Sequence, residues 1–407
     1  MINPKLIEYI MISASIQRWN DYPRMVEFVE LDKQAHKFII AYFLAKLEKE
    51  GTIDFEHLIE AGIFEFLRRI VVTDIRPDVF RTILRKKKRE LNRWVIENIK
   101  EMIIDIDNGC FLQKFKDYLN NDKMYEKERF ILKAASYIST RWEFSIISQT
   151  SGFISDIEDT KKEIEDEIED YYELLGIRKI ALNKKLAHII DLGGRLRFQK
   201  RWAQTPRVPQ TAVLGHMLTV AFLSYFYSLK IGACSKMLQN NFFCALFHDL
   251  PEALTRDIIS PVKYSVSGLD DIIIEIEINR LQNRVLPLIP QNLQDEFRYL
   301  LGLYDNDTKK DEFLNKIYTK NIKIVDTLKT YNEDKYNAID GTALKMCDRL
   351  SAFIEAVVSI SHGVKSNELI LGKEQILSKI KESGYVNGVD FYAIAKDIEE
   401  YFLKNSP

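Results

Sequence analysis

The chain has 407 residues, which at roughly 150 residues per domain predicts two or three domains. Hydrophobic residues make up 46% and charged residues 29%, so a disordered chain and a collagen are both excluded. The 58 Lys and Arg nearly cancel the 60 Asp and Glu, which argues against nucleic acid as the main partner. The four cysteines form no C-x-x-C pair, which favours reduced thiols over a disulfide or zinc framework.

The N-terminus lacks the charged, apolar and small-residue regions of a signal peptide. The longest apolar stretch, Met217 to Leu229, is too short to span a bilayer and contains Thr219 and Ser224. We therefore expect a cytoplasmic protein with no membrane partner.

Apolar residues recur at steps of three and four along most of the chain, which is typical of amphipathic helices. The clearest segments are 38–47, 95–106, 218–229 and 344–358. Val71-Val72 and Ile258-Ile259 are β-branched runs too brief to count as strands. The sequence predicts an all-α fold.

The segment 155–176 is strongly acidic. Between Asp156 and Glu173 there are ten acidic and two basic residues, and Ser155 resembles an N-cap before an acidic first turn. One helical stripe carries Ile157, Ile164, Ile168 and Leu175. We interpret this segment as a solvated helical connector between two halves rather than as an interaction site.

The two halves share a repeated pattern. The matches are Arg18-Trp19 with Arg201-Trp202, Pro23-Arg24 with Pro206-Arg207, Phe64 with Phe247 and Asp74 with Asp257 at an offset of 183, His36 with His216 at 180, and Leu132 to Ser136 with Leu344 to Asp348 at 212. Constant offsets over several anchors favour a duplication. We predict helical domains at 1–154 and 177–407, joined by the connector at 155–176.

The second half contains His248-Asp249 at the end of an apolar run. Burying an unpaired carboxylate there is costly, so a partner or a cation is expected. On a continuous helix Glu252 would share a face with both residues, unless Pro251 interrupts the turn.

His216 and Asp348 also lie in apolar helical surroundings. With His248 and Asp249 they supply two imidazoles and two carboxylates from three helices, a set that suits a divalent ion with open positions. A lone buried His is usually a hydrogen-bonded core residue, and a lone Asp is usually a cap. The order H…HD…D is harder to explain in that way, so we favour a metal site.

This pattern resembles the HD superfamily of metal-dependent phosphohydrolases, and more narrowly its YfbR-like 5'-deoxynucleotidase branch. The matching stretches are Arg201-Trp202, Val213 with His216, His248-Asp249 with Glu252, Thr255 and Asp257, Pro261 to Lys263, and Lys345 with Asp348. The resemblance implies one divalent metal ion (Mn, Co, Fe, Zn or Mg) and hydrolysis of a nucleoside (deoxy)5'-monophosphate. Family members commonly have an acidic residue where this chain has Gly215, which leaves the substrate open.

Five further residues are candidates for proton transfer or substrate binding. Glu252 is the candidate for proton transfer, and Asp257 resembles a substrate-contacting carboxylate. Arg201 offers a forked donor for a phosphate, Lys263 a point charge, and Trp202 a surface for a sugar or base. The alternatives are a surface salt bridge for the arginine, a solvated lysine, core packing for the tryptophan and a helix cap for the aspartate.

The same site is compatible with other functions. A nucleoside triphosphate or a cyclic nucleotide is the alternative substrate, and a nucleotide- or nucleic-acid-binding regulator with a slow or structural metal site is the alternative class. No histidine occurs between Asp249 and Asp348, so we expect a single metal ion. We expect a small nucleotide as partner rather than nucleic acid, and a homodimer is left open.

The first half lacks most of the ligand set. It has Glu65-Phe66 in place of the His-Asp pair, Ser136 in place of Asp348, and only His36 retained. We predict that this copy keeps the scaffold and has lost the metal. Basic residues gather in it, notably Arg68, Arg69, Arg81 and the run 85–89. The alternatives for these residues are binding of an anionic ligand or nucleic acid and a solvated helix face, and we favour the solvated face.

Overall fold

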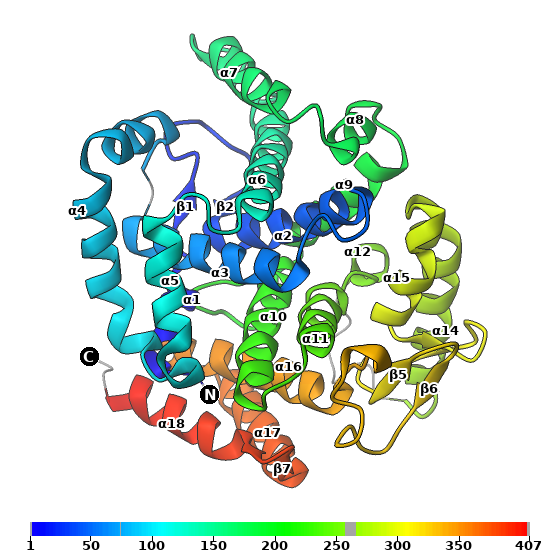
Figure 1. The fold of residues 1–407 in the computed structure, drawn as a ribbon. Helices are drawn as coiled ribbons and strands as arrows, with labels where there is room; N and C mark the ends of the chain where they lie inside the picture. Colours follow the sequence, from blue (N-terminus) through cyan, green and yellow to red (C-terminus); the bar gives the residue numbers. More distant parts are fainter. Residues whose placement is uncertain (1, 74, 257–265, 405–407) are drawn as a thin grey trace. The chain divides into compact units, whose positions relative to one another are not determined.

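The computed structural model describes residues 2–73, 75–256 and 266–404, and the chain separates into two compact units, Met1–Tyr171 and Tyr172–Pro407 (Figure 1). This division falls inside the segment predicted as a connector. Two of the predicted site residues, Asp257 and Lys263, lie outside the described residues.

The first unit is a helical bundle with one short hairpin. Its elements are α1 (Pro4–Ile12), β1 (Gln17–Arg18), β2 (Phe28–Val29), α2 (Glu30–Leu47), α3 (Phe55–Val72), α4 (Pro77–Ile103), α5 (Cys110–Asn120), α6 (Glu126–Ile147) and α7 (Ile157–Glu169). The strands β1 and β2 pair in antiparallel fashion. Helix α2 is buried along almost its whole length and packs most extensively on α6, so these two helices form the core.

The second unit is also a helical bundle. Its helices are α8 (Leu175–Ala181), α9 (Lys185–Arg195), α10 (Val213–Lys230), α11 (Ser235–Phe247), α12 (Glu252–Thr255), α14 (Leu269–Arg280), α15 (Gln294–Leu300), α16 (Gly341–Ser361), α17 (Asn367–Ser383) and α18 (Phe391–Lys404). Three antiparallel hairpins accompany them: β3 (Leu303–Tyr304) with β4 (Lys309–Lys310), β5 (Lys316–Tyr318) with β6 (Ile322–Ile324), and β7 (Tyr385–Val386) with β8 (Val389–Asp390).

Helix α10 is the central element of the second unit. It is apolar on all sides rather than on one stripe, as expected for a helix enclosed by others. It packs against α11 and α16, and Figure 1 shows it in green beside both. Among the described residues, no helix combines the length and the apolar character needed to cross a bilayer.

The predicted all-α fold is confirmed, and strands within the described residues are only two or three residues long. The segment predicted as a helix over 95–106 ends earlier, because α4 stops at Ile103. Asp107, Asn108 and Gly109 follow with positive φ angles of 50°, 51° and 87°. Asp, Asn and Gly tolerate this left-handed backbone better than other residues, which explains the end of the helix.

The acidic segment forms α7, with Ile157, Ile164 and Ile168 buried as the stripe predicts. Leu175 is not part of this helix, since it begins α8. The residue that caps α7 is Asp156 rather than Ser155, and it makes no side-chain capping bond. Helix α7 packs on α6, so it lies within the first unit.

Candidate metal centre

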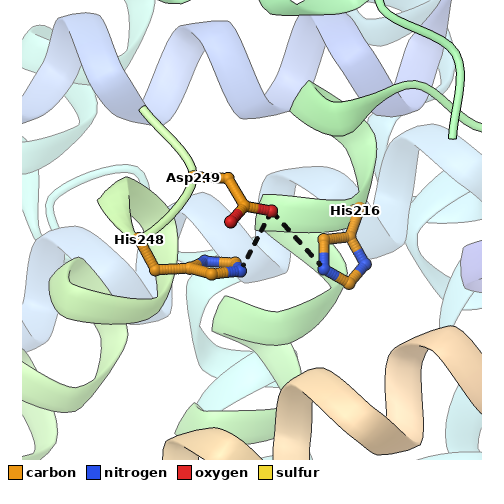
Figure 2. Close-up of side chains that lie close together, drawn as sticks. All are labelled: His216, His248 and Asp249. Carbon is orange, nitrogen blue, oxygen red and sulfur yellow. Dashed lines mark ion pairs between the residues drawn. The ribbon is translucent and has the colours of Figure 1, made fainter. Parts of the chain in front are cut away.

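Two histidines and an aspartate converge at the centre of the second unit. His216 lies in the first turn of α10, His248 directly follows the last residue of α11, and Asp249 comes next in the chain. Each offers one ligand atom, and these three atoms all lie within 4.8 Å of one another. Figure 2 shows the two rings and the carboxylate pointing toward a common point.

The surroundings of His248 determine which of its nitrogens is available. Its Nδ1 lies 2.7 Å from the carbonyl oxygen of Ala245, and a carbonyl can only accept, so Nδ1 carries a hydrogen. The Nε2 atom is buried and makes no hydrogen bond to any described residue. It lies 3.3 Å from Oδ2 of Asp249. In the neutral form of the ring the lone pair is therefore on Nε2, the buried atom that faces the carboxylate of Asp249.

His216 is held from both sides. Its Nε2 lies 3.0 Å from Oδ1 of Asp348 and 3.9 Å from Oδ2 of Asp249. Its Nδ1 lies 3.0 Å from Oγ of Ser351 and 3.8 Å from Oε1 of Glu355. Hydrogen bonds of this kind on the far nitrogen orient histidine ligands in metalloproteins.

Asp348 completes the predicted set of four. It lies on α16, and its Oδ1 is also 4.0 Å from Nε2 of His248. Burial opposes ionisation of both carboxyl groups, yet the neighbouring imidazoles and Arg201 hold the pKa values of Asp348 and Asp249 below their usual range. Burial by itself would lower the pKa of His248, but Asp249 and then Asp348 raise it to about 9.

These residues fit a divalent cation. Two carboxylates and two imidazoles are a common donor set for first-row divalent metals. A buried imidazole nitrogen without a hydrogen bond is costly unless something coordinates it, and His248 supplies such an atom.

A second cluster adjoins the ligands. The Oε2 atom of Glu355 accepts hydrogen bonds from Nε of Arg201 at 3.2 Å and from the indole of Trp202 at 2.9 Å. Its Oε1 accepts from the hydroxyl of Thr211 at 2.8 Å. Burial would raise the pKa of Glu355, but the Arg201 and Arg207 guanidinium groups lower it to about 2.

Sequence reasoning missed Glu355, although this glutamate connects Arg201 and Trp202 to the candidate ligand His216. A signal was available, because Glu355 follows Asp348 by seven residues and so shares its face of α16. Arg201 also lies beside the ligands, with its Nη1 atom 3.8 Å from Oδ2 of Asp249. Trp202 packs against Gly372 of α17, where an added Cβ would come within 2.8 Å of its ring.

Glu252 is positioned differently from the helical expectation. Helix α11 ends at Phe247, and α12 begins only at Glu252 after a turn that includes Pro251. Pro251 does interrupt the helix, so the same-face argument does not apply to this glutamate. Glu252 is nevertheless buried, and its backbone carbonyl accepts a hydrogen bond from Gln199 at 2.9 Å.

Comparison with known proteins places this centre in context. Residues 193–377 match the HD domain family, a range that contains all four candidate ligands. A 5'-deoxynucleotidase of Pasteurella multocida is 27% identical over 124 residues, 28% of this chain and 59% of that protein. A 5'-deoxynucleotidase of Cronobacter sakazakii is 24% identical over 196 residues, 47% of this chain and 80% of that protein.

The chain thus spans about three fifths of the length of the Pasteurella relative. Among solved structures, an HD-domain phosphohydrolase from Listeria innocua aligns with a TM-score of 0.38 and 20% identity. That alignment covers 54% of this chain and 86% of the other.

Proposed function

Because this chain belongs to the HD superfamily of phosphohydrolases, we propose that its second unit hydrolyses a nucleoside (deoxy)5'-monophosphate. The observation that carries the proposal is the convergence of His216, His248, Asp249 and Asp348 around a buried imidazole nitrogen. The 5'-deoxynucleotidase relatives favour the monophosphate over a triphosphate or a cyclic nucleotide.

The four converging side chains would hold one divalent ion. Such an ion supplies Lewis acidity, which activates water and offsets the charge of a phosphate. The chain prepares the site itself: Ala245 fixes the tautomer of His248, and Ser351 orients His216.

Arg201 is the proposed phosphate-binding residue. Its Nε is anchored on Glu355, which aligns the guanidinium, and its Nη1 lies on the side of Asp249. A planar, permanently charged fork suits the oxygens of a phosphate. Trp202, fixed by the same glutamate, is the proposed contact for the sugar or base. Glu252 is the proposed proton carrier, and Asp257 and Lys263 are the proposed further substrate contacts.

The test is a phosphate-release assay on the purified chain. Deoxynucleoside and nucleoside monophosphates, triphosphates and cyclic nucleotides are offered with Mn²⁺, Co²⁺ or Mg²⁺. We expect inorganic phosphate from monophosphates and its loss in Asp249→Ala, while Asp397→Ala, at an exposed aspartate of α18, keeps full turnover. Triphosphate as product, or unchanged turnover in Asp249→Ala, would refute the proposal.

The tandem duplication is part of the proposal, and matching contacts support it. In the first unit Glu143 accepts from Nε of Arg18 at 3.0 Å and from the indole of Trp19 at 2.9 Å, as Glu355 does in the second. Oγ of Ser139 lies 3.4 Å from Nδ1 of His36, and Oγ of Ser351 lies 3.0 Å from Nδ1 of His216. Both tryptophans also have positive φ angles, 59° and 55°.

A further inference from the structure

The first unit contains a cavity of about 530 Å³ between its helices. It is bordered by the β1–β2 loop and by α2, α3, α4, α6 and α7, the last being the acidic helix. Seven Lys and Arg side chains line it, against five carboxylates. Its volume lies in the range of about 300–1,000 Å³ that small-molecule sites occupy.

Lys33 is one of the basic residues that line this cavity. It projects from α2, is buried, and its Nζ donates to the hydroxyl of Ser136 at 2.5 Å. Among the described residues it forms no ion pair. The carboxylates that act on its charge, Glu30 and Glu143, both pair with Arg18, at 3.1 and 3.0 Å. A buried ammonium with one neutral partner is costly, and an anion in the cavity would remove that cost.

Most of the carboxylates that line the cavity form ion pairs with arginine or lysine side chains other than Lys33 and Arg68. Glu30 also pairs with Arg69 at 3.2 Å, and Glu65 pairs with Lys37 at 3.2 Å. Arg68 is half-buried over the ring of Phe80, and it forms no ion pair or hydrogen bond within the described part of the chain. Lys33 and Arg68 are therefore two positive charges available to a ligand.

The cavity offers more than charge. Gln34, the residue after Lys33 in α2, is buried and also lines the cavity. Its amide oxygen receives no hydrogen bond from the described residues. Aromatic rings of Trp19, Tyr22 and Tyr137 contribute to the walls. A hydrogen-bond acceptor and aromatic walls suit the sugar and base of a nucleotide. A bare phosphate would contact neither of them.

The position of Lys33 parallels that of the metal in the other unit. By the proposed duplication, Ser136 corresponds to the candidate ligand Asp348. In the second unit that aspartate lies against His216, whereas in the first the serine contacts an ammonium group. A side-chain cation thus stands near the place where the other copy would hold a metal ion.

We propose that the first unit binds a small phosphorylated ligand of the nucleotide class in this cavity without a metal ion, its phosphate lying against Lys33 and Arg68. The residues that line this cavity all belong to the first unit and include none of the candidate metal ligands. The proposed site does not depend on the identity of the substrate in the second unit.

Calorimetric titration of the full chain tests this. The Asp249→Ala background with EDTA is used so that the probe, dAMP, is not consumed. We expect Lys33→Met and Arg68→Gln each to weaken dAMP binding about tenfold, the loss of one charge-assisted hydrogen bond. Lys86→Met, at an exposed lysine of α4, is the matched control and should bind as the parent does. Circular dichroism establishes that each variant is folded.

Each outcome of the titration either supports or overturns the proposed dAMP site. Weakening in both cavity variants with an unaffected Lys86→Met supports the site. No binding by the parent, equal binding in both cavity variants, or equal weakening in the control overturns it. Inorganic phosphate serves as a second probe, and saturation by phosphate with no binding of dAMP would overturn the nucleotide assignment. If Lys33→Met fails to fold, Arg68→Gln decides alone.

Discussion

Single contacts determine what each of the two units can do. In the second unit Ala245 fixes the hydrogen of His248 on Nδ1 and leaves Nε2 for a ligand. In the first unit the corresponding position is Glu65, which pairs with Lys37. Under the proposed duplication, a candidate metal ligand in the second unit thus corresponds to a glutamate held in an ion pair in the first.

The four candidate ligands can be selected from the sequence alone, whereas Glu355 cannot. His248-Asp249 is a local motif, and His216 and Asp348 stand out as polar residues in apolar helices. Glu355 acts through contacts with residues more than 140 positions away, and no local pattern reveals such partners. The two turns that separate it from Asp348 are a signal only once α16 is known to face the centre.

Glu355 gives the first prediction. Replacing it in Glu355→Gln removes the charge that anchors Arg201, so we expect the kcat/KM of monophosphate hydrolysis to fall about 10–100-fold. Glu143→Gln is the matched control, since Glu143 makes the same contacts with Arg18 and Trp19 in the other unit. Equal loss in both variants, or none in Glu355→Gln, would show that this glutamate does not position the substrate-binding arginine.

Helices were predicted better than their ends. The segments predicted at 38–47, 218–229 and 344–358 all lie inside longer helices, α2, α10 and α16, because apolar periodicity survives burial. The end of α4 and the break after α11 depend on left-handed Asp and Asn and on Pro251, whose effects periodicity does not register. The break matters most, because the His-Asp pair and Glu252 no longer lie on one continuous helix.

The packing of α3 on α2 gives the second prediction. A Cβ at Gly62 would lie 2.4 Å from the ring of Phe38, which is fully enclosed in the core. We expect Gly62→Ala to lower the free energy of unfolding by about 1–3 kcal/mol through overpacking. Gly152→Ala is the control, since nothing lies within 4 Å of its added Cβ. Urea unfolding measures both, and equal stability of the two variants would contradict the close approach of these helices.

Lys33 on α2 gives the third prediction. Burial and then Arg18 lower its pKa to about 7, although Glu30 and Glu143 oppose this and Lys37 adds to it. In the unfolded chain the value is 10.5, so between about pH 7 and 10.5 the unfolded state binds more protons. The free energy of unfolding therefore rises with pH in this window, by at most about 1.4 kcal/mol per unit.

Lys33→Met removes this dependence and the cost of the buried charge. We expect the variant to be more stable than the wild type at pH 7, with the difference shrinking toward pH 10. Urea unfolding in phosphate-free buffer at several pH values measures it. Parallel stability curves for the two proteins would show that Lys33 titrates normally.

At the scale of the whole molecule, the two helical units gather side chains of different charge. The second gathers two imidazoles and two carboxylates, a site for a cation. The first gathers lysines and arginines around its cavity, which is the proposed anion site. Composition hides this division, because 58 basic and 60 acidic residues nearly cancel over the chain. The repeated offsets in the sequence predict two copies of one fold, and the side-chain contacts show that the charged residues of the two units differ.

The metal content of the purified full-length protein tests the account most directly. Elemental analysis should find one equivalent of a divalent transition metal per chain in the wild type and in Asp397→Ala, and essentially none in Asp249→Ala. Two equivalents in the wild type, or an undiminished equivalent in Asp249→Ala, would contradict a single metal centre in the second unit.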